Sequence, residues 1–491
     1  MKKALLALGF VALALAAVLV VRTLQVPEPA AAAAGGVPGI SFDEAAAAER
    51  LAGAIRFPTV SYASGAPIDT VAFLDLHQYL ERTFPLVHGT LTRETVAGAS
   101  LLYTWGGEDA SLGPVVLMGH IDVVPVTAEN LGEWTHAPFA GDVADGFVWG
   151  RGTLDDKTTV LSILEAVEGL IREGYRPPRT VYLTFGHDEE VSGQYGARAI
   201  VDLLVSRGVQ PALVLDEGGF MTEGAIPGIA GRAAIVGIAE KGYISLRLRA
   251  QAQGGHSSMP TGRTAVGALS RAVAALEARP FPSSLDGPTR GMLDAMAPYS
   301  PFARRLALAN LWLTGPLVRR EMAATPLGAA LMHTTTAPTM LRAGIKDNVL
   351  PPEATAVVNL RIRPGETIAT VTRRVREVIA DSMIVVEPLD SVGVNPSPVS
   401  DVNSPAYRLI EETIRGMAPG ERIPVLPYLV MGGTDARFWG PHTDRVFRFL
   451  AVPLGDGDIE RIHGVNERIA VTDYATSANF FARLLKGIDR L

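Results

Sequence analysis

The sequence contains no cysteine among its 491 residues, and this absence narrows the chemistry open to the chain. Disulfides, thiolate nucleophiles, thiolate zinc sites and iron–sulfur clusters are all excluded. Any bound metal must therefore be held by histidine, aspartate and glutamate. Histidine is itself scarce, with nine in the chain, so each one can be weighed individually.

The sequence also lacks a large excess of charge of either sign. Its 44 basic and 51 acidic residues give a net charge of −7, and charged residues make up 19% against 48% hydrophobic residues. This composition excludes a disordered tail and a nucleic-acid binder with a basic face. The chain is long enough to bury a sizeable core, and a prior of roughly one domain per 150 residues allows about three domains.

One long apolar run stands at the N-terminus. Lys2 and Lys3 precede the 18 apolar residues Ala4–Val21, which end at Arg22. This length lies at the short end of a membrane-spanning helix and at the long end of a signal-peptide core. We favour an uncleaved anchor over a cleaved signal, because Arg22 and the distant Ala30–Ala34 tract suit a signal peptidase poorly. In both cases the positive-inside rule sends the rest of the chain to the periplasmic or extracellular side.

Short apolar runs alternate with helical patterns beyond the Pro- and Ala-rich linker. The spacing predicts strands at Pro114–Met118, Thr180–Phe185 and Ala212–Leu215, with helices at Thr158–Arg172 and Ala197–Val205. Such alternation is typical of an α/β domain with a mainly parallel sheet. Ligands gather beyond the carboxyl ends of strands in these sheets, and each predicted strand here is followed by a polar cluster.

The pattern of apolar and polar residues changes near residue 237. Ile244–Arg249 and Ala356–Ile362 alternate apolar with polar residues, as half-exposed antiparallel strands do, and Thr264–Glu277 predicts a helix. Ala303–Leu317 predicts an apolar helix that would either cover an acyl chain or form plain core. We therefore expect a separate α/β unit, inserted into the main domain as a lid or a dimerisation surface. A final helix is predicted at Thr472–Leu485.

The expected division of the chain has five parts. They are an anchor or signal segment (1–25), a Pro/Ala-rich linker (26–41), the first part of the main domain (42–236), the inserted unit (237–365) and the second part of the main domain (366–491).

Two of the polar clusters suggest metal chemistry. His120 and Asp122 lie two residues apart at a strand end, where one can ligate a metal while the other orients it, although a structural pair is the alternative. Asp188, Glu189 and Glu190 are adjacent acids, and this arrangement persists most easily when a cation compensates their repulsion. The two glutamates suggest one group that binds metal and one that moves protons, and a solvated acidic loop is the alternative.

Other candidates are weaker when taken alone. Asp155 lies on a Gly-rich turn at a predicted helix start, where helix capping explains one aspartate and the glycines fit a backbone that approaches something closely. Asp216 and Glu217 follow the third strand. His256 follows two glycines in the inserted unit and His463 lies on a late polar loop, so each would by itself be a turn or surface histidine.

Together these clusters resemble the di-zinc aminoacylase/carboxypeptidase family of metallopeptidases, most closely its carboxypeptidase S and secreted N-fatty-acyl-amino-acid synthase/hydrolase branch. The resemblance extends from about Phe42 to the C-terminus. It rests on ordered motifs at Gly119–Pro125, Trp134–Phe139, Trp149–Lys157, Asp188–Glu190, Gly255–Ser258 and Gly464–Glu467.

The resemblance implies a site that holds two Zn²⁺ ions. Asp122 would orient a histidine ligand, Glu189 would be the general base, and His256 would reach from the inserted unit to polarise the scissile carbonyl. Relatives place one ligand at a single acid where this chain offers both Asp216 and Glu217, and the choice between them stays open. The implied metal ligands are His120, Asp155 as the bridge, Glu190, His463 and one of those two acids.

The resemblance also implies how a substrate is held. Arg361, on the strand after Asn348, would bind a substrate carboxylate, and Gly433 and Thr434 belong to a loop that would line the same pocket.

The function implied is zinc-dependent hydrolysis of an amide bond in N-acyl amino acids or in short peptides with a free C-terminal carboxylate. The alternatives are a dipeptidase or another amidase of the same fold, or a membrane-tethered binding protein that has lost catalysis. Retention of Asp122, Glu189 and every ligand type argues against the last. The expected partners are a small-molecule or short-peptide substrate, the membrane through the N-terminal segment and a second copy in a homodimer, with no nucleic acid.

Overall fold

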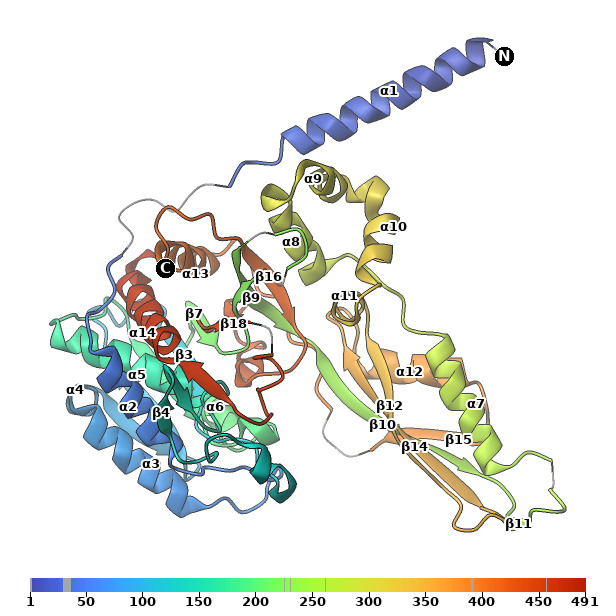
Figure 1. Ribbon diagram of the computed structural model, residues 1–491, viewed down its shortest axis with the longest axis horizontal. Helices are drawn as coiled ribbons and strands as arrows, with labels where there is room; N and C mark the ends of the chain where they lie inside the picture. Colours follow the sequence, from blue (N-terminus) through green and yellow to red (C-terminus); the bar gives the residue numbers. More distant parts are fainter. Residues whose placement is uncertain are drawn as a thin grey trace.

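The computed structural model describes residues 2–29, 37–224, 226–229, 231–260, 262–389, 393–455 and 457–491. It has a large main unit, a smaller sheet-containing unit that projects away from it, and an N-terminal helix that projects in another direction (Figure 1). The Ala30–Ala34 tract considered as a cleavage site lies outside the described residues.

The main unit is built on a mixed sheet with strand order β1-β2-β6-β3-β7-β17-β9-β8-β18, in which β16 also pairs with β9. The neighbours β6, β3, β7 and β17 run parallel, whereas β1 and β2 form an antiparallel edge. The predicted α/β fold with a mainly parallel sheet is confirmed. The strands are β1 (Thr92–Val96), β2 (Ser100–Trp105), β3 (Val115–His120), β6 (Val181–Gly186), β7 (Leu213–Asp216), β8 (Phe220–Glu223), β9 (Arg232–Glu240), β16 (Val425–Val430), β17 (Val446–Arg448) and β18 (Pro453–Leu454).

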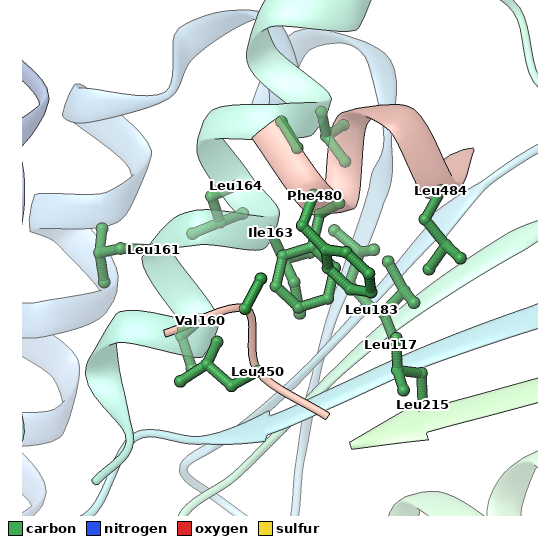
Figure 2. Packing of buried hydrophobic residues seen from close by; sticks show 14 of the residues in the cluster. Leu117, Val160, Leu161, Ile163, Leu164, Leu183, Leu215, Leu450, Phe480 and Leu484 are labelled. Atoms are coloured by element: carbon green, nitrogen blue, oxygen red, sulfur yellow. The ribbon is translucent and has the colours of Figure 1, made fainter. Parts of the chain in front are cut away.

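Helices cover both faces of this sheet because strand residues alternate between two cores. In β3, Leu117 belongs to the cluster under α5 and α14, while Val116 and Met118 belong to the cluster under α6. Figure 2 shows Ile163 of α5 and Phe480 of α14 packed together over Leu117 and other strand residues. The helices of the main unit are α2 (Glu44–Ile55), α3 (Thr70–Thr83), α4 (Pro85–Thr90), α5 (Lys157–Arg172), α6 (Ala197–Ser206), α13 (Pro405–Gly416) and α14 (Val471–Lys486).

A small second sheet joins two distant parts of the chain near the strand ends. β5 (Phe147–Trp149) pairs with β4 (Asp142–Ala144) on one side and with β19 (Arg468–Ala470) on the other. The loop before β19 is thereby held beside the Gly-rich turn that follows β5.

The inserted unit contains an antiparallel sheet with strand order β12-β14-β10-β15, covered by α7 (Ala265–Ala278) and α12 (Ile368–Ile379). β15 (Ile384–Pro388) pairs with β10 although it lies beyond residue 365, and α12 packs in the same core. We therefore propose that this unit ends near residue 388 rather than 365. Its other strands are β10 (Gly242–Gln251), β12 (Thr335–Ala343), β14 (Glu353–Ile362) and the short pair β11 (Gly255–His256) and β13 (Val349–Leu350).

Residues 287–332 form a group of helices that we call the helical cap. Its members are α8 (Gly287–Met296), α9 (Phe302–Ala309), α10 (Leu311–Met322) and α11 (Pro326–Met332). The single helix predicted at Ala303–Leu317 is wrong, because Asn310 separates α9 from α10 and its buried side-chain amide donates to backbone oxygens of Leu306 and Leu19. The buried faces of the cap pack against Ile235 of β9 and Leu426 of β16, so they form core.

The N-terminal helix α1 (Lys2–Leu24) is long and apolar enough to cross a membrane. It projects from the helical cap into open space (Figure 1), and it contacts α9 close to its C-terminal end.

Candidate active site

The first group of site residues lies at the carboxyl end of β3. His120 is buried as the last residue of this strand, and its Nδ1 lies 3.0 Å from the Asp122 backbone oxygen and 3.3 Å from Asp122 Oδ1. The two Asp122 carboxylate oxygens accept hydrogen bonds from the backbone N–H groups of Glu189 and Glu190. Asp122 therefore orients the histidine ring and fixes the start of the acidic segment after β6 at the same time.

Asp155 lies between two histidines. Its Oδ1 is 2.9 Å from His120 Nε2, and its Oδ2 is 3.0 Å from His463 Nε2. Burial raises the pKa of the Asp155 carboxyl, but hydrogen bonds from both histidines outweigh this effect and lower it below the ordinary value. One carboxylate that uses each oxygen toward a different histidine has the arrangement required of a bridge between two cations.

Glu190 completes this cluster. Its Oε2 lies 3.1 Å from His463 Nε2, while its Oε1 is buried without a hydrogen-bond partner. Hydrogen bonds to Asp155 and Glu190 raise the pKa of His463 to about 10. Ligand atoms of His120, Asp155 and Glu190 all lie within 4.8 Å of one another, which makes them a candidate metal-binding group.

The acidic residues after β6 differ in what their side chains do. Asp188 accepts hydrogen bonds from the backbone N–H groups of Tyr195 and Gly196, so it stabilises the following loop. Glu189 begins a short 3₁₀ turn beside Glu190, and burial raises the pKa of its carboxyl well above the ordinary value despite the nearby His120.

Asp216 and Glu217 differ in what their side chains contact. Asp216 Oδ1 accepts from the Glu217 N–H and Oδ2 accepts from the Ala436 N–H, so both oxygens are already engaged by the backbone. Burial raises the pKa of the Glu217 carboxyl well above its ordinary value, and the nearby carboxylates of Asp155 and Asp156 add to this shift. Glu217 therefore lies close enough to the carboxylates of the cluster to be affected by them, whereas Asp216 holds the loop after β16.

An ion pair that the sequence did not single out joins the two loops of the site. Arg151 forms a buried ion pair with Glu467 and donates from Nη2 to the backbone oxygens of His463 and Gly464. Glu467 Oε1 in turn accepts from the backbone N–H groups of Gly152, Leu154 and Asp155. Arg151 and Glu467 belong to the motifs Trp149–Lys157 and Gly464–Glu467, but only their contacts reveal that they position Asp155 against His463.

The glycines of the Gly-rich turn explain how closely its backbone packs. Gly152 has φ of +91°, and a Cβ atom there would lie 2.8 Å from Val123. Asp156, which follows Asp155 at the end of this turn, accepts hydrogen bonds from the His120 N–H and from the Thr159 hydroxyl. Asp156 thus contacts the backbone of His120, whereas Asp155 contacts its ring.

The loop after β16 lies against the main site. Thr434 is buried and donates through Oγ1 to Glu240 Oε1 at 2.8 Å, while Gly433 is exposed next to it. Arg448 also donates to Glu240 Oε1, at 2.7 Å. The Gly433-Thr434 loop is thus held at the point where β9 leaves the main unit.

Arg361 lies near the junction of the two units, on β14 opposite Tyr243 of β10. Its guanidinium stacks over the Tyr243 ring, 4.9 Å from the ring centroid. Lys241, which lies between β9 and β10, and Arg363 are further cations near Arg361. Arg363 forms an ion pair with Asp286, whereas no carboxylate among the described residues lies within 4.0 Å of the Arg361 guanidinium.

His256 and Asn348 are not brought to the metal-binding group. His256 is exposed on β11, and its Nδ1 accepts hydrogen bonds from the N–H and the hydroxyl of Ser258. The Asn348 backbone oxygen accepts from the neighbouring Ser257 N–H. Figure 1 shows β11 at the end of the inserted unit that lies farthest from the main unit.

The donor set of the main cluster fits a metal. Histidine nitrogens and carboxylate oxygens converge from separate loops, and a buried Glu190 oxygen has no partner within the described part of the chain. Burying so many carboxylates together is costly without a cation to compensate them. Zinc, in particular, is commonly bound by nitrogen and oxygen ligands of this kind.

Comparison with known proteins agrees with this geometry. The family model described as peptidase family M20/M25/M40 matches residues 116–487. The chain belongs to this family. It is an enzyme, a metallohydrolase that cleaves amide bonds, and the resemblance inferred from the motifs is confirmed.

Individual relatives of this M20 chain match along most of its length. It is 40% identical over 444 residues to the N-fatty-acyl-amino acid synthase/hydrolase PM20D1 of Mus musculus, which covers 90% of this chain and 87% of that protein. It is 30% identical over 480 residues to carboxypeptidase S of Saccharomyces cerevisiae, which covers 88% of this chain and 82% of that protein. The solved structure of an M20 family metallo-carboxypeptidase, Sso-CP2 from Sulfolobus solfataricus, has the same fold, with a TM-score of 0.65 at 18% identity over 91% of this chain and 99% of that chain.

Proposed function

We propose that this chain is a di-zinc hydrolase of N-acyl amino acids and of short peptides with a free C-terminal carboxylate. The observation that carries the proposal is Asp155, whose two oxygens face His120 and His463 beside Glu190. The similarity to N-fatty-acyl-amino acid synthase/hydrolase PM20D1 and to carboxypeptidase S supports this substrate class.

We assign His120 as the residue that would hold one zinc ion and Glu190 and His463 as those that would hold the other, and Asp155 would serve both. Glu217 is our choice for the remaining ligand, because both Asp216 oxygens accept backbone hydrogen bonds. Zinc bound there would act as a Lewis acid that lowers the pKa of water and polarises the scissile carbonyl.

Glu189 is our choice for the general base. Its backbone N–H is fixed by Asp122, which also orients His120, so its carboxyl group starts from a defined position beside the cluster. As water adds to the amide carbon, the Glu189 carboxylate takes one water proton. It then gives this proton to the leaving nitrogen as the carbon–nitrogen bond breaks, which yields a carboxylic acid and an amine.

The cationic junction supports recognition of a substrate carboxylate. Arg361 can hold a carboxylate through two parallel charge-assisted hydrogen bonds, and Lys241 adds positive charge nearby. The exposed Gly433 and the adjacent Thr434 would line the main-unit side of the same space. Asn348 lies beside β11, at the end of the inserted unit farthest from the main unit (the distal tip), so it would contact substrate only when this tip reaches the site.

His256 is assigned to the scissile carbonyl, where it would donate a hydrogen bond to the developing oxyanion. Its place at the distal tip means that it reaches a metal site either by hinge closure within one chain or by contributing to a second copy in a homodimer. Lys241, between β9 and β10, lies where such a hinge would act.

The N-terminal helix supports a membrane tether. α1 is compatible with an uncleaved anchor, with Lys2 and Lys3 on the cytoplasmic side and the catalytic unit on the periplasmic or extracellular side. Cleavage of this segment would instead release a secreted enzyme.

The deciding experiment is a substrate panel for the purified full-length protein with measured zinc content. We expect kcat/KM to be highest for N-acyl amino acids, lower for dipeptides and lowest for carboxamides of the N-acyl amino acids. Faster hydrolysis of dipeptides would favour the dipeptidase alternative. Absence of any amide hydrolysis in protein that holds two zinc ions would contradict the proposal.

A further inference from the structure

The helical cap carries a second apolar face that its own core does not use. On α10, Leu311, Gly315 and Val318 are buried, as expected for the side that packs on the sheet. Trp312, Leu313 and Leu317 lie on the other side of the same helix and are 56%, 43% and 63% exposed. Three exposed apolar side chains on one side of a short surface helix make this face a candidate binding surface.

This face adjoins the end of α1. The Asn310 side chain, between α9 and α10, donates to the Leu19 backbone oxygen of α1 at 3.1 Å, and Thr23 of α1 is buried in the same contact. Val26, just after α1, packs against the cap core. The cap is thus attached to the last turns of the helix that is long and apolar enough to cross a membrane.

A cavity of about 500 Å³ lies where α1 meets the cap. Its lining includes the guanidinium-bearing residues Arg22 of α1, Arg290 of α8 and Arg319 of α10, together with Trp312. Arg290 Nε donates to both Asp294 carboxylate oxygens at 2.8 Å, whereas Arg22 and Arg319 form no ion pair within the described part of the chain. Such a cavity suits an anion, and the indole ring beside it suits the boundary between polar and apolar surroundings.

We propose that the α10 face rests in the headgroup region of the bilayer that α1 crosses, with an anionic phospholipid headgroup in the arginine-lined cavity. Three features support this occupant: continuity with the anchor, positive charge in the cavity, and an exposed tryptophan and two leucines next to it. Tryptophan is enriched at membrane–water interfaces because its ring is amphipathic, and arginine is attracted there by anionic lipid headgroups. The inference rests on the proposed tether, but not on the proposed substrate.

Docking of the cap would fix the whole enzyme relative to the membrane. α8 of the cap packs against β16, and β16 leads directly into the Gly433-Thr434 loop of the active site. An acyl substrate that partitions into the bilayer would then meet an enzyme held at the same surface.

The absence of cysteine makes a direct test possible. A fluorophore on the single cysteine of full-length Leu317→Cys, reconstituted in phosphatidylglycerol/phosphatidylcholine vesicles, should be strongly quenched by a lipid that carries a nitroxide on its headgroup. The matched control is Leu131→Cys on the main unit, which is similarly exposed at 52% but lies on a 3₁₀ helix outside the cap. Equal quenching at both positions would overturn the proposal.

Charge reversal tests the cavity. The double variant Arg290→Glu, Arg319→Glu should lower the equilibrium constant for docking of the cap on anionic vesicles by at least about ten-fold, as measured by quenching of the fluorophore at position 317. Each arginine near an anionic surface contributes substantially to the attraction between protein and membrane. Arg342→Glu with Arg373→Glu, two exposed arginines of the inserted unit, should change nothing. Equal effects of the two pairs, or equal docking of the parent in pure phosphatidylcholine, would overturn the headgroup assignment.

Further measurements separate the alternatives. Inorganic phosphate added in excess should leave docking unchanged, and complete reversal by phosphate would mean that the cavity takes a free anion instead. A mass lower by the N-terminal segment in the reconstituted protein would overturn the inference, because the anchor would be missing. Hydrolysis of a soluble N-acyl amino acid in the same samples should persist in all these variants, so its loss would count against folding or against the proposed function.

Discussion

The main unit and the inserted unit contribute to the proposed site in different ways. His120, Asp155 and His463 lie within hydrogen-bonding distance in a single chain, although more than three hundred residues separate the first from the last. His256, in the inserted unit, lies exposed at the tip farthest from them. Backbone hydrogen bonds and a buried ion pair fix the first group, whereas the second depends on how two units are arranged. We therefore expect metal binding to depend on the main unit alone, and we expect full catalysis to depend also on how the two units are arranged.

Removal of the Asp155 carboxylate should have the largest effect on metal binding by the main unit. Asp155→Ala should abolish detectable turnover and the binding of at least one metal ion, because two cations at short range repel unless an anion lies between them. Metal analysis and kcat measure these effects. Asp202→Ala, an exposed aspartate on α6, is the control. Two bound metals with normal turnover would move the bridge elsewhere, with Asp156 as the next candidate.

Removing the base separates chemistry from metal binding within the same unit. Glu189→Gln should lower kcat by roughly 10²–10⁴-fold, the range for general acid–base catalysis, with the metal content unchanged. The amide keeps the size of the side chain while losing its ability to take a proton. Activity within about ten-fold of the parent would refute the assignment.

The inserted unit should influence turnover without influencing metal content. His256→Ala should lower kcat by roughly 10²–10³-fold, the usual loss for one oxyanion donor. Loss of metal in this variant would make His256 a ligand instead.

Mixing two inactive variants distinguishes hinge closure from exchange between copies. If His256 serves a partner's site, a mixed dimer of His256→Ala and Glu189→Gln chains has one complete site, and activity returns. If His256 closes onto its own chain, every site in the mixture lacks one group, so activity stays at the level of the single variants. The readout is kcat/KM after dissociation and reassembly of the mixed chains.

Arg361 at the junction should affect selectivity more than chemistry. Arg361→Ala should reduce kcat/KM for an N-acyl amino acid by roughly 10- to 150-fold, the effect of a lost hydrogen bond to a charged group, and should affect the carboxamide counterpart much less. Equal losses on both substrates would show that Arg361 is structural and that another group reads the carboxylate.

The most gradual predicted effect is a dependence of metal affinity on pH. In the metal-free chain, hydrogen bonds to Asp155 and Glu190 raise the pKa of His463 to about 10, so this residue holds a proton at neutral pH. A metal must displace that proton, and affinity should therefore fall as the pH falls below about 10, by about ten-fold per pH unit for each proton released. Competition with a chelator at several pH values measures the slope, and a flat profile would contradict it.

The sequence predicted the central strands well because each is a short buried run that ends in a polar cluster. β3, β6 and β7 begin and end within two residues of the predicted strands. Parallel strands bring their carboxyl ends to one edge, which is why His120 and Glu190 could be expected to meet.

The remaining features depend on contacts that local periodicity does not carry. Nothing in the pattern of β15 indicates that it pairs with β10 rather than with the main sheet. The break at Asn310 depends on hydrogen bonds of its side chain, one of them to α1 nearly three hundred residues away. The pairing of Arg151 with Glu467 and the remote position of His256 are likewise tertiary facts.

The buried Arg151–Glu467 pair has a consequence for how the enzyme is made. A chain synthesised only as far as the inserted unit already contains His120, Asp155 and Glu190, but it has neither His463 nor the carboxylate that holds the Gly-rich turn. β17, β18 and α14 also come after the insertion, so the main sheet and its core cannot close earlier. We therefore expect the complete proposed site, with His463 in place, to form only after the whole chain has been synthesised.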